Sequence, residues 1–278
     1  MDLISIKKPL FGKEVEFFLP DMDKTLITPV VEAAYDEGLW LSKIFNLYDE
    51  KSELSQLNKK RELNVSKEFL EVLKRSLEMC KETGGAYDVS LGRLFLARKR
   101  KENEPRLSCS FKDIEIKKNI VKLTHKDVLI DLGSIAKGYI ADKMADYIRE
   151  QGIEAGVVNA RGDIVVFGDE PLLIGIQNPR KKEELMGKIR LLDESIATSG
   201  DYNQFNKDYK KSHIINSKDA ISVSVVAKTL LEAEVYSTAL FVVDKKSRQK
   251  LLSKNKSIKA LVIDNNMNAE FYNGFKMI

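Results

Sequence analysis

Cysteine and histidine are scarce in this chain of 278 residues, which contains two of each. Cys80 and Cys109 lack the spacing of a metal-binding pair, and His125 and His213 lie too far apart along the chain to indicate a zinc site. Two cysteines also cannot form the dense disulfide framework of a small secreted domain. We therefore expect free thiols and no structural zinc.

Long apolar runs are also absent. No stretch reaches the roughly 18 apolar residues that suggest a membrane-spanning helix, and residues 1–12 lack the apolar region and cleavage site of a signal peptide. The net charge of +4 is spread along the chain, with its densest basic run at residues 98–101, so nucleic-acid binding is not indicated. These absences predict a cytoplasmic protein without a membrane span.

The motifs of several common enzyme classes are missing as well. Gly133 and Gly138 have the spacing of an NTPase phosphate loop, but Tyr139 and Ile140 follow where that loop needs Lys and then Ser or Thr. The sequence contains no Gly-x-Gly-x-x-Gly after a strand and no Gly-x-Ser-x-Gly elbow. A Rossmann dinucleotide site and a serine-hydrolase site are therefore unsupported.

The chain has enough apolar sequence, 43% of its residues, for a full core, as one domain over residues 1–278 or as two closely packed subdomains. Strands are expected within 1–20 and 113–125, over 156–160, 164–167, 172–177, 189–192, 213–216, 221–227 and 260–264, and near 271. Helices are expected over 28–45 with Thr28 as N-cap, after Ser52, and over 66–83, 230–243 and 246–254. Groups of short strands separated by helices favour an α+β fold.

The stretch from Asp131 to Asp163 carries the strongest functional signal. A glycine-containing turn leads, after Ser134, into an amphipathic helix with Gly152 as the expected C-cap. Free backbone N–H groups and the helix dipole favour phosphate binding at such a helix start, where Lys137 adds a positive charge. Asp131 and Ser134 supply the oxygen ligands that magnesium prefers. The stretch therefore predicts a ligand with phosphate groups and an assisting metal.

Glu234 and Thr238 lie four residues apart in the apolar helix expected over 230–243, so they share one face. If that helix is buried, the carboxylate and the hydroxyl need polar partners. The alternative is a glutamate at the surface and a threonine that bonds the carbonyl four residues before it, and spacing alone leaves both open. Residues 199–202 are predicted to form a loop.

Eight segments resemble, in order, motifs of the ApbE-like flavin transferases. They are YDEKSELSQLN (48–58), TGGAYDVSLGRL (83–94), DLGSIAKGYIAD (131–142), VVNARGDI (157–164), GIQNPR (175–180), ATSGDY (197–202), HIIN (213–216) and AEVYSTALFV (233–242). The resemblance implies an α+β fold that binds FAD and magnesium. It also implies an enzyme that transfers the FMN part of FAD to a threonine hydroxyl of a target flavoprotein and releases AMP.

The resemblance implies roles for individual residues. Contacts with FAD would come from Tyr48, which would stack on the isoalloxazine ring, and from Ala86, Tyr87, Asp88, Asp131, Lys137 and Ile215. Oxygen ligands for magnesium would come from Ser134, Glu234 and Thr238. His213 is the expected general base, and a structural role is the alternative for it.

Three positions depart from the family pattern. Glu234 stands where the family has a metal-binding aspartate, Arg161 replaces a glycine, and Asn216-Ser217 replaces Asp-Pro. Two other functions stay open, and the extra methylene of Glu234, which moves the carboxylate although magnesium demands near-ideal geometry, favours the second of them. One is hydrolysis of FAD to FMN and AMP, and the other is FAD binding without turnover. The sequence predicts neither the acceptor protein nor an oligomeric state.

Overall fold

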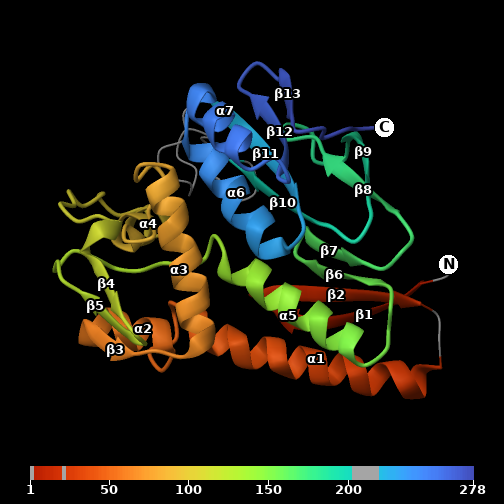
Figure 1. Cartoon of the computed structure of the whole chain (residues 1–278), viewed down its shortest axis with the longest axis horizontal. Helices are drawn as coiled ribbons and strands as arrows, with labels where there is room; N and C mark the ends of the chain where they lie inside the picture. The colour runs from red at the N-terminus through yellow and green to blue at the C-terminus, as the bar shows by residue number, and fades with distance from the viewer. Residues whose placement is uncertain (1–2, 21–22, 202–218) are drawn as a thin grey trace.

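The computed structural model describes residues 3–20, 23–201 and 219–278. An eight-stranded antiparallel sheet forms its centre (Figure 1). In spatial order its strands are β1 (Leu3–Leu10), β2 (Lys13–Pro20), β6 (Gly156–Ala160), β7 (Asp163–Phe167), β10 (Ser195–Gly200), β11 (Ala220–Ala227), β12 (Lys259–Asp264) and β13 (Ala269–Tyr272). With the helices that pack on it, the sheet confirms the α+β fold expected from the sequence.

Two helices pack on this sheet and carry much of the candidate site. Helix α5 (Ala136–Glu150) packs on β6 and β7, and α6 (Leu230–Val242) packs on β10 and β11. The long helix α1 (Lys24–Phe45) packs against α5 (Figure 1). Helix α6 is apolar on almost every side because it is enclosed by the sheet, α5 and α3, which confirms the burial expected for it.

A second group of elements lies beside the large sheet (Figure 1). It contains α2 (Glu53–Lys60), α3 (Lys67–Glu82), α4 (Gly92–Arg100), the 3₁₀ helix η1 (Phe111–Asp113) and a small sheet of β3 (Glu62–Asn64), β5 (Ile120–Leu123) and β4 (Ile114–Lys117). Ser52 caps α2, as the sequence predicts, and Ser66, which was predicted as the first residue of a helix, caps α3. One hydrophobic cluster joins Phe17 of the large sheet with Phe69 and Val121 of this group, so the two groups share a core.

The remaining elements lie toward the C-terminus. They are the hairpin of β8 (Leu172–Gln177) and β9 (Leu185–Leu191), and helix α7 (Lys245–Lys254).

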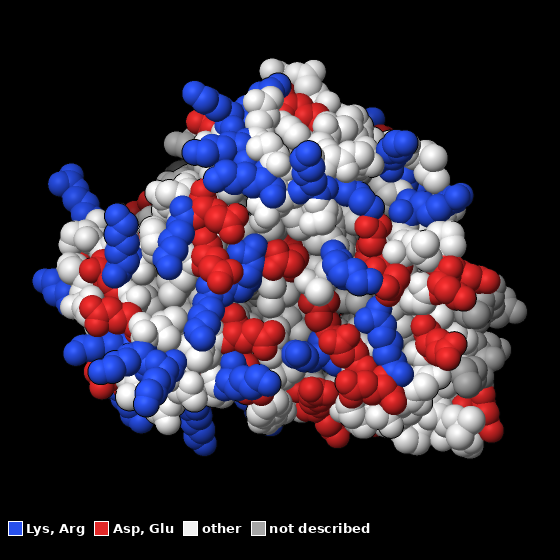
Figure 2. All heavy atoms as spheres, in the orientation of Figure 1, with Lys and Arg blue, Asp and Glu red and all other residues white. Residues whose placement is uncertain are grey.

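Basic and acidic side chains are interspersed over the face of the molecule in Figure 2. Within the ranges that the structure describes, no helix combines the length and the apolar character needed to cross a lipid bilayer.

The start of α1 differs from the prediction. The helix begins at Lys24, not at Thr28, because Asp23 is its N-cap. The Asp23 carboxylate accepts a hydrogen bond of 2.9 Å from the N–H group of Thr25. Pro29, which the prediction placed in the first turn, therefore lies inside the helix. A proline removes one backbone donor there, and packing of the long helix compensates.

The loop predicted over 199–202 is also wrong at its start. Ser199 and Gly200 belong to β10, where they pair with β11. Serine and glycine have turn chemistry in isolation, but a strand between two neighbours in a sheet overrides that preference. The strand predicted at 213–216 lies outside the described residues.

Candidate functional site

A cleft with a volume of about 1440 Å³ opens over the start of α5 and along the face of α6 that carries Glu234 and Thr238. Its walls also include the β1–β2 turn, the residues after α1, and parts of β8 and β10. The predicted cofactor and metal residues that line it are Tyr48, Ala86, Tyr87, Asp88, Asp131, Ser134, Lys137, Glu234 and Thr238. The other two predicted site residues, His213 and Ile215, lie outside the described residues.

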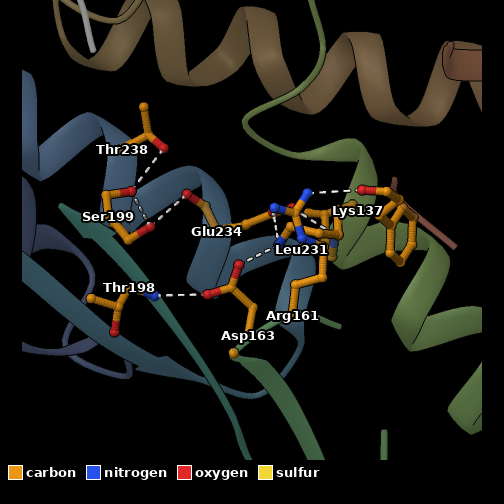
Figure 3. A network of polar contacts seen from close by, with 12 residues as sticks. Lys137, Arg161, Asp163, Thr198, Ser199, Leu231, Glu234 and Thr238 are labelled. Atoms are coloured by element: carbon orange, nitrogen blue, oxygen red, sulfur yellow. Dashed lines mark hydrogen bonds and ion pairs between the residues drawn. The ribbon is translucent and has the colours of Figure 1, made fainter. Parts of the chain in front are cut away.

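Lys137, which lines this cleft, lies between two carboxylates (Figure 3). Its ammonium group pairs with Asp163 Oδ2 and lies 2.5 Å from Glu234 Oε1. Asp163 is fixed in turn, because its Oδ1 accepts a hydrogen bond of 2.9 Å from the N–H group of Thr198. Burial opposes the charge on Lys137, but the two carboxylates outweigh it and raise its pKa. Lys137 is therefore a charged ammonium at the helix start.

Helices α5 and α6 supply hydrogen-bond acceptors to each other's first turns. Glu234 Oε2 of α6 accepts a bond of 2.6 Å from the N–H group of Gly138. Asp142 of α5 accepts bonds of 2.8 Å from the N–H groups of Leu230 and Leu231. Gly138 permits this close approach, since a Cβ atom there would lie 2.6 Å from the Leu230 carbonyl oxygen. The two helices therefore fix the position of Glu234 relative to the start of α5.

Hydroxyl groups form a second cluster beside Glu234 (Figure 3). Ser199 Oγ lies 2.9 Å from Ser237 Oγ and 3.2 Å from Thr238 Oγ1. Glu234 itself is only 5% exposed, so the alternative of a surface glutamate is wrong. Burial raises the pKa of Glu234, and the nearby Lys137 ammonium opposes that shift. The cluster presents a carboxylate and several hydroxyl oxygens to the cleft.

Ser134 is hydrogen-bonded to a different partner. Its Oγ lies 2.8 Å from the phenolic oxygen of Tyr87. Asp131, just before it, accepts a bond of 2.9 Å from the N–H group of Gly133. Burial raises the pKa of both Asp131 and Tyr87. Ser134 therefore lines the same cleft as Glu234 and Thr238, with its hydroxyl bonded to Tyr87.

Asp88 stabilises the chain around it. Its Oδ1 accepts bonds of 2.8 Å from the Ser90 N–H group and 2.7 Å from the Ser90 hydroxyl. Its Oδ2 accepts a bond of 3.0 Å from the N–H group of Phe111. Both oxygens are thus bonded to the protein, which fixes the loop that carries the neighbouring half-buried Ala86.

Tyr48 is the most exposed aromatic side chain of the cleft, with 59% of its surface accessible. The Lys99 ammonium lies 4.3 Å from its ring centroid and donates a hydrogen bond of 2.6 Å to its hydroxyl. This exposed ring, which the Lys99 side chain contacts, is available for stacking on a planar ligand.

Sequence reasoning missed three partners of the predicted residues. Asp163 was identified only as part of a turn, whereas its carboxylate pairs with Lys137. Ser199 and Ser237 were given no role, although they connect β10 to Thr238. The Gly-Asp at positions 162–163 and the Ser-Thr at positions 237–238 both lie in segments that resemble family motifs, and that was the available signal.

Comparison with known proteins identifies similar chains. A family model described as "ApbE family" matches residues 11–262. A FAD:protein FMN transferase of Buchnera aphidicola is 25% identical over 95% of this chain and 87% of the relative. A FAD:protein FMN transferase of Vibrio cholerae is 31% identical over 70% of this chain and 67% of the relative.

Two solved structures extend the comparison to the fold. The ApbE protein of Thermotoga maritima superposes with a TM-score of 0.84 at 23% identity, over 97% of both chains. The flavin transferase ApbE of Vibrio cholerae superposes with a TM-score of 0.78 at 25% identity, over 97% of this chain and 96% of that chain.

Proposed function

The chain belongs to the ApbE family, and from this premise we propose that it transfers the FMN part of FAD to a protein acceptor and releases AMP. The relatives named above are FAD:protein FMN transferases. The main support is the content of one cleft, which holds the exposed ring of Tyr48, the charged Lys137 at a helix start, and the oxygen cluster at Glu234. A flavin, a pyrophosphate and a hard cation need these three kinds of partner.

The flavin is bound at the end of the cleft that contains Tyr48. The exposed ring of this residue stacks on the isoalloxazine, while Ala86 and Tyr87 line the pocket beside it. Asp88 contributes by holding its loop, because both of its oxygens accept bonds from the protein. Ile215, outside the described residues, is proposed as a further wall of the pocket.

The pyrophosphate is bound at the start of α5. The dipole of α5 favours negative charge at its N-terminus, and the Lys137 ammonium adds a full positive charge there. Asp131, which lines the cleft just before this helix, contacts the nucleotide. A bound phosphate would thus meet the Lys137 ammonium and the helix dipole.

The donor set beside Lys137 fits magnesium. Among the described residues, no three His, Cys, Asp or Glu side chains converge as a metal cluster. Glu234 and Thr238 nevertheless supply hard oxygens, Ser134 offers another in the same cleft, and magnesium in proteins usually keeps several waters. When bound, the ion would neutralise charge on the pyrophosphate oxygens.

The reaction exchanges one phosphorus–oxygen bond for another. The hydroxyl oxygen of an acceptor threonine bonds to the FMN phosphorus, the bond from that phosphorus to the bridging oxygen breaks, and AMP leaves with the bridging oxygen. The residues of the cleft hold the pyrophosphate in place and exclude water from it. The hydroxyl proton passes to a base, for which His213, outside the described residues, is the candidate.

The test is incubation of the purified protein with FAD and magnesium, with and without a threonine-containing acceptor domain. AMP is quantified by chromatography, and covalent flavin is detected by fluorescence after denaturing electrophoresis. AMP release together with flavin on the acceptor supports the proposal. Glu234→Gln should reduce the rate by about 100-fold or more, because metal stabilisation of phosphate charge is worth several kcal/mol.

Two other outcomes correspond to the alternative functions. AMP and free FMN, formed equally with and without the acceptor, would identify an FAD pyrophosphatase. Bound FAD without AMP would identify a binding protein. The latter alternative has one specific observation in its favour, since the Glu234 carboxylate is already paired with Lys137.

A further inference from the structure

Both oxygens of the Glu234 carboxylate already have partners. Oε1 lies 2.5 Å from the Lys137 ammonium, and Oε2 accepts the bond of 2.6 Å from the Gly138 N–H group. The same ammonium also pairs with Asp163 (Figure 3). A cation that takes a ligand oxygen from Glu234 must therefore compete with Lys137.

The charges of this group do not cancel. Glu234 and Asp163 carry two negative charges against the single positive charge of Lys137, in a place where all three side chains are at most 20% exposed. A buried excess of negative charge is unfavourable and favours a further cation. A divalent ion would turn the local balance from minus one to plus one, the sign that a pyrophosphate requires.

The length of the Glu234 side chain explains why its carboxylate pairs with Lys137. Gly138 lets α6 approach α5 so closely that a Cβ atom would meet the backbone of Leu230 at 2.6 Å. Across this short gap the longer side chain of Glu234 reaches the first turn of α5, and with it Lys137. An aspartate would hold its carboxylate one methylene farther from both partners.

We propose that Lys137 is a resident cation of the metal site: it offsets one of the two negative charges in the metal-free protein, and when a divalent ion binds Glu234 the ammonium gives up that partner, keeps Asp163 and can turn toward the phosphates of FAD. This exchange of the ammonium for a metal ion at Glu234, which rests on the proposed metal site, couples the binding of the metal to the binding of FAD. Metal binding frees a phosphate-binding group, so metal and FAD each increase the affinity for the other.

The first test measures the accessibility of the Lys137 amine. Wild-type protein without FAD is treated with a water-soluble amine-acylating reagent, with and without Mn²⁺, and labelled lysines are quantified by mass spectrometry. Lys137 is 20% exposed and should react roughly fivefold faster or more when the metal is bound, a factor at the lower end of linked-site couplings. Lys259, which is paired with Glu194 at 2.5 Å, is the internal control and should not change.

The second test measures the coupling between the ligands. Mn²⁺ binding is followed by electron paramagnetic resonance and FAD binding by flavin fluorescence, in wild-type protein and in Lys137→Met. Mn²⁺ should tighten FAD binding in wild type by about 5-fold or more, and this gain should vanish in Lys137→Met.

The outcomes separate the exchange from the metal site. Suppose that Mn²⁺ binds the wild type but not Glu234→Gln, and that Mn²⁺ leaves the labelling of Lys137 in the wild type unchanged. This result would overturn the exchange and leave the metal site intact. Absence of Mn²⁺ binding to the wild type would overturn both the exchange and the proposed metal site. AMP release with an unresponsive Lys137 would likewise leave the proposed function intact and refute the exchange.

Discussion

Replacing Gly138 by alanine tests the contact between α5 and α6 on which the site depends. In an ordinary helix interior, this change stabilises a protein by about 1 kcal/mol, because glycine loses more backbone freedom on folding. At Gly138, however, the new methyl carbon would lie 2.6 Å from the Leu230 carbonyl oxygen and 2.8 Å from the Leu231 nitrogen. Both atoms are backbone, so α6 must move as a body.

The magnitude follows from the distances. Relaxed contacts of a carbon atom lie near 3.5 to 4.0 Å, so the helices must separate by roughly 1 Å. Overpacking costs about 1 to 3 kcal/mol, and the separation also weakens the carboxylate bonds made by Glu234 and Asp142. With about 1 to 2 kcal/mol for the weakened bonds, and after subtraction of about 1 kcal/mol for helix propensity, we expect the free energy of unfolding to fall by about 1 to 4 kcal/mol.

Gly38→Ala in α1 is the matched control. Its Cβ atom would lie 2.5 Å from the Met144 sulfur, which is the flexible part of a side chain and can move away. The free energy of unfolding of this variant should stay within about 1 kcal/mol of the wild-type value.

Urea denaturation followed by circular dichroism measures both variants. Mn²⁺ affinity, measured in parallel, should fall in Gly138→Ala and not in Gly38→Ala. The reasoning is refuted if Gly138→Ala is as stable as wild type, or if both alanine variants lose the same stability.

Three further predictions concern other parts of the fold. Burial raises the pKa of Asp142 from 3.8 to about 7, so between these values the folded state holds a proton that the unfolded chain releases. The wild-type free energy of unfolding should therefore fall by up to about 4 kcal/mol as the pH rises from 4 to 8, and Asp142→Asn should remove this part of the slope. Tyr48→Ala should raise the Kd for FAD about 10-fold in flavin fluorescence titrations, without loss of stability, because stacking on an exposed ring is removed. Arg248→Met should lower the free energy of unfolding by about 3 kcal/mol in urea denaturation, since buried Arg248 donates to the Leu240 carbonyl and pairs with Asp219.

Conservative variants provide the controls for these predictions. Tyr48→Phe keeps the ring and should retain FAD affinity, so equal losses in the two Tyr48 variants would contradict stacking. Arg248→Lys keeps the charge but not the planar fork, and should lose less than Arg248→Met. If the free energy of unfolding changes with pH in parallel in the wild type and in Asp142→Asn, the raised pKa of Asp142 is refuted.

The cap of α2 could be predicted because it depends on neighbouring residues, and the cap of α3 follows the same local rule. Ser52 and Ser66 lie directly before their helices and bond to N–H groups three residues later. The same local reasoning placed the cap of α1 five residues late, since Thr28 before Pro29 has the chemistry of a helix start and Asp23 is the actual cap. Local chemistry thus identified the helices and left one boundary undetermined.

The site required information that local patterns do not contain. Glu234 and Thr238 were found from their spacing, but the partner of Glu234 lies 96 residues away at Gly138. Ser199 has turn chemistry, and only its pairing in β10 brings it to Thr238. Family-like motifs identified which residues share the cleft, whereas the pairing of Lys137 with both carboxylates depends on how α5, α6 and β7 pack.

The reciprocal hydrogen bonds between α5 and α6 have a consequence for how the site assembles. The amides of Gly138, Leu230 and Leu231 acquire their carboxylate partners only when both helices are docked. A partly folded chain would therefore leave both helix starts unsatisfied, which makes the docking of the two helices a single cooperative event. Hydrogen–deuterium exchange at these three amides should proceed through one shared opening. The oxygen cluster at Glu234 would then exist completely or not at all, and no intermediate with a half-formed metal site would accumulate.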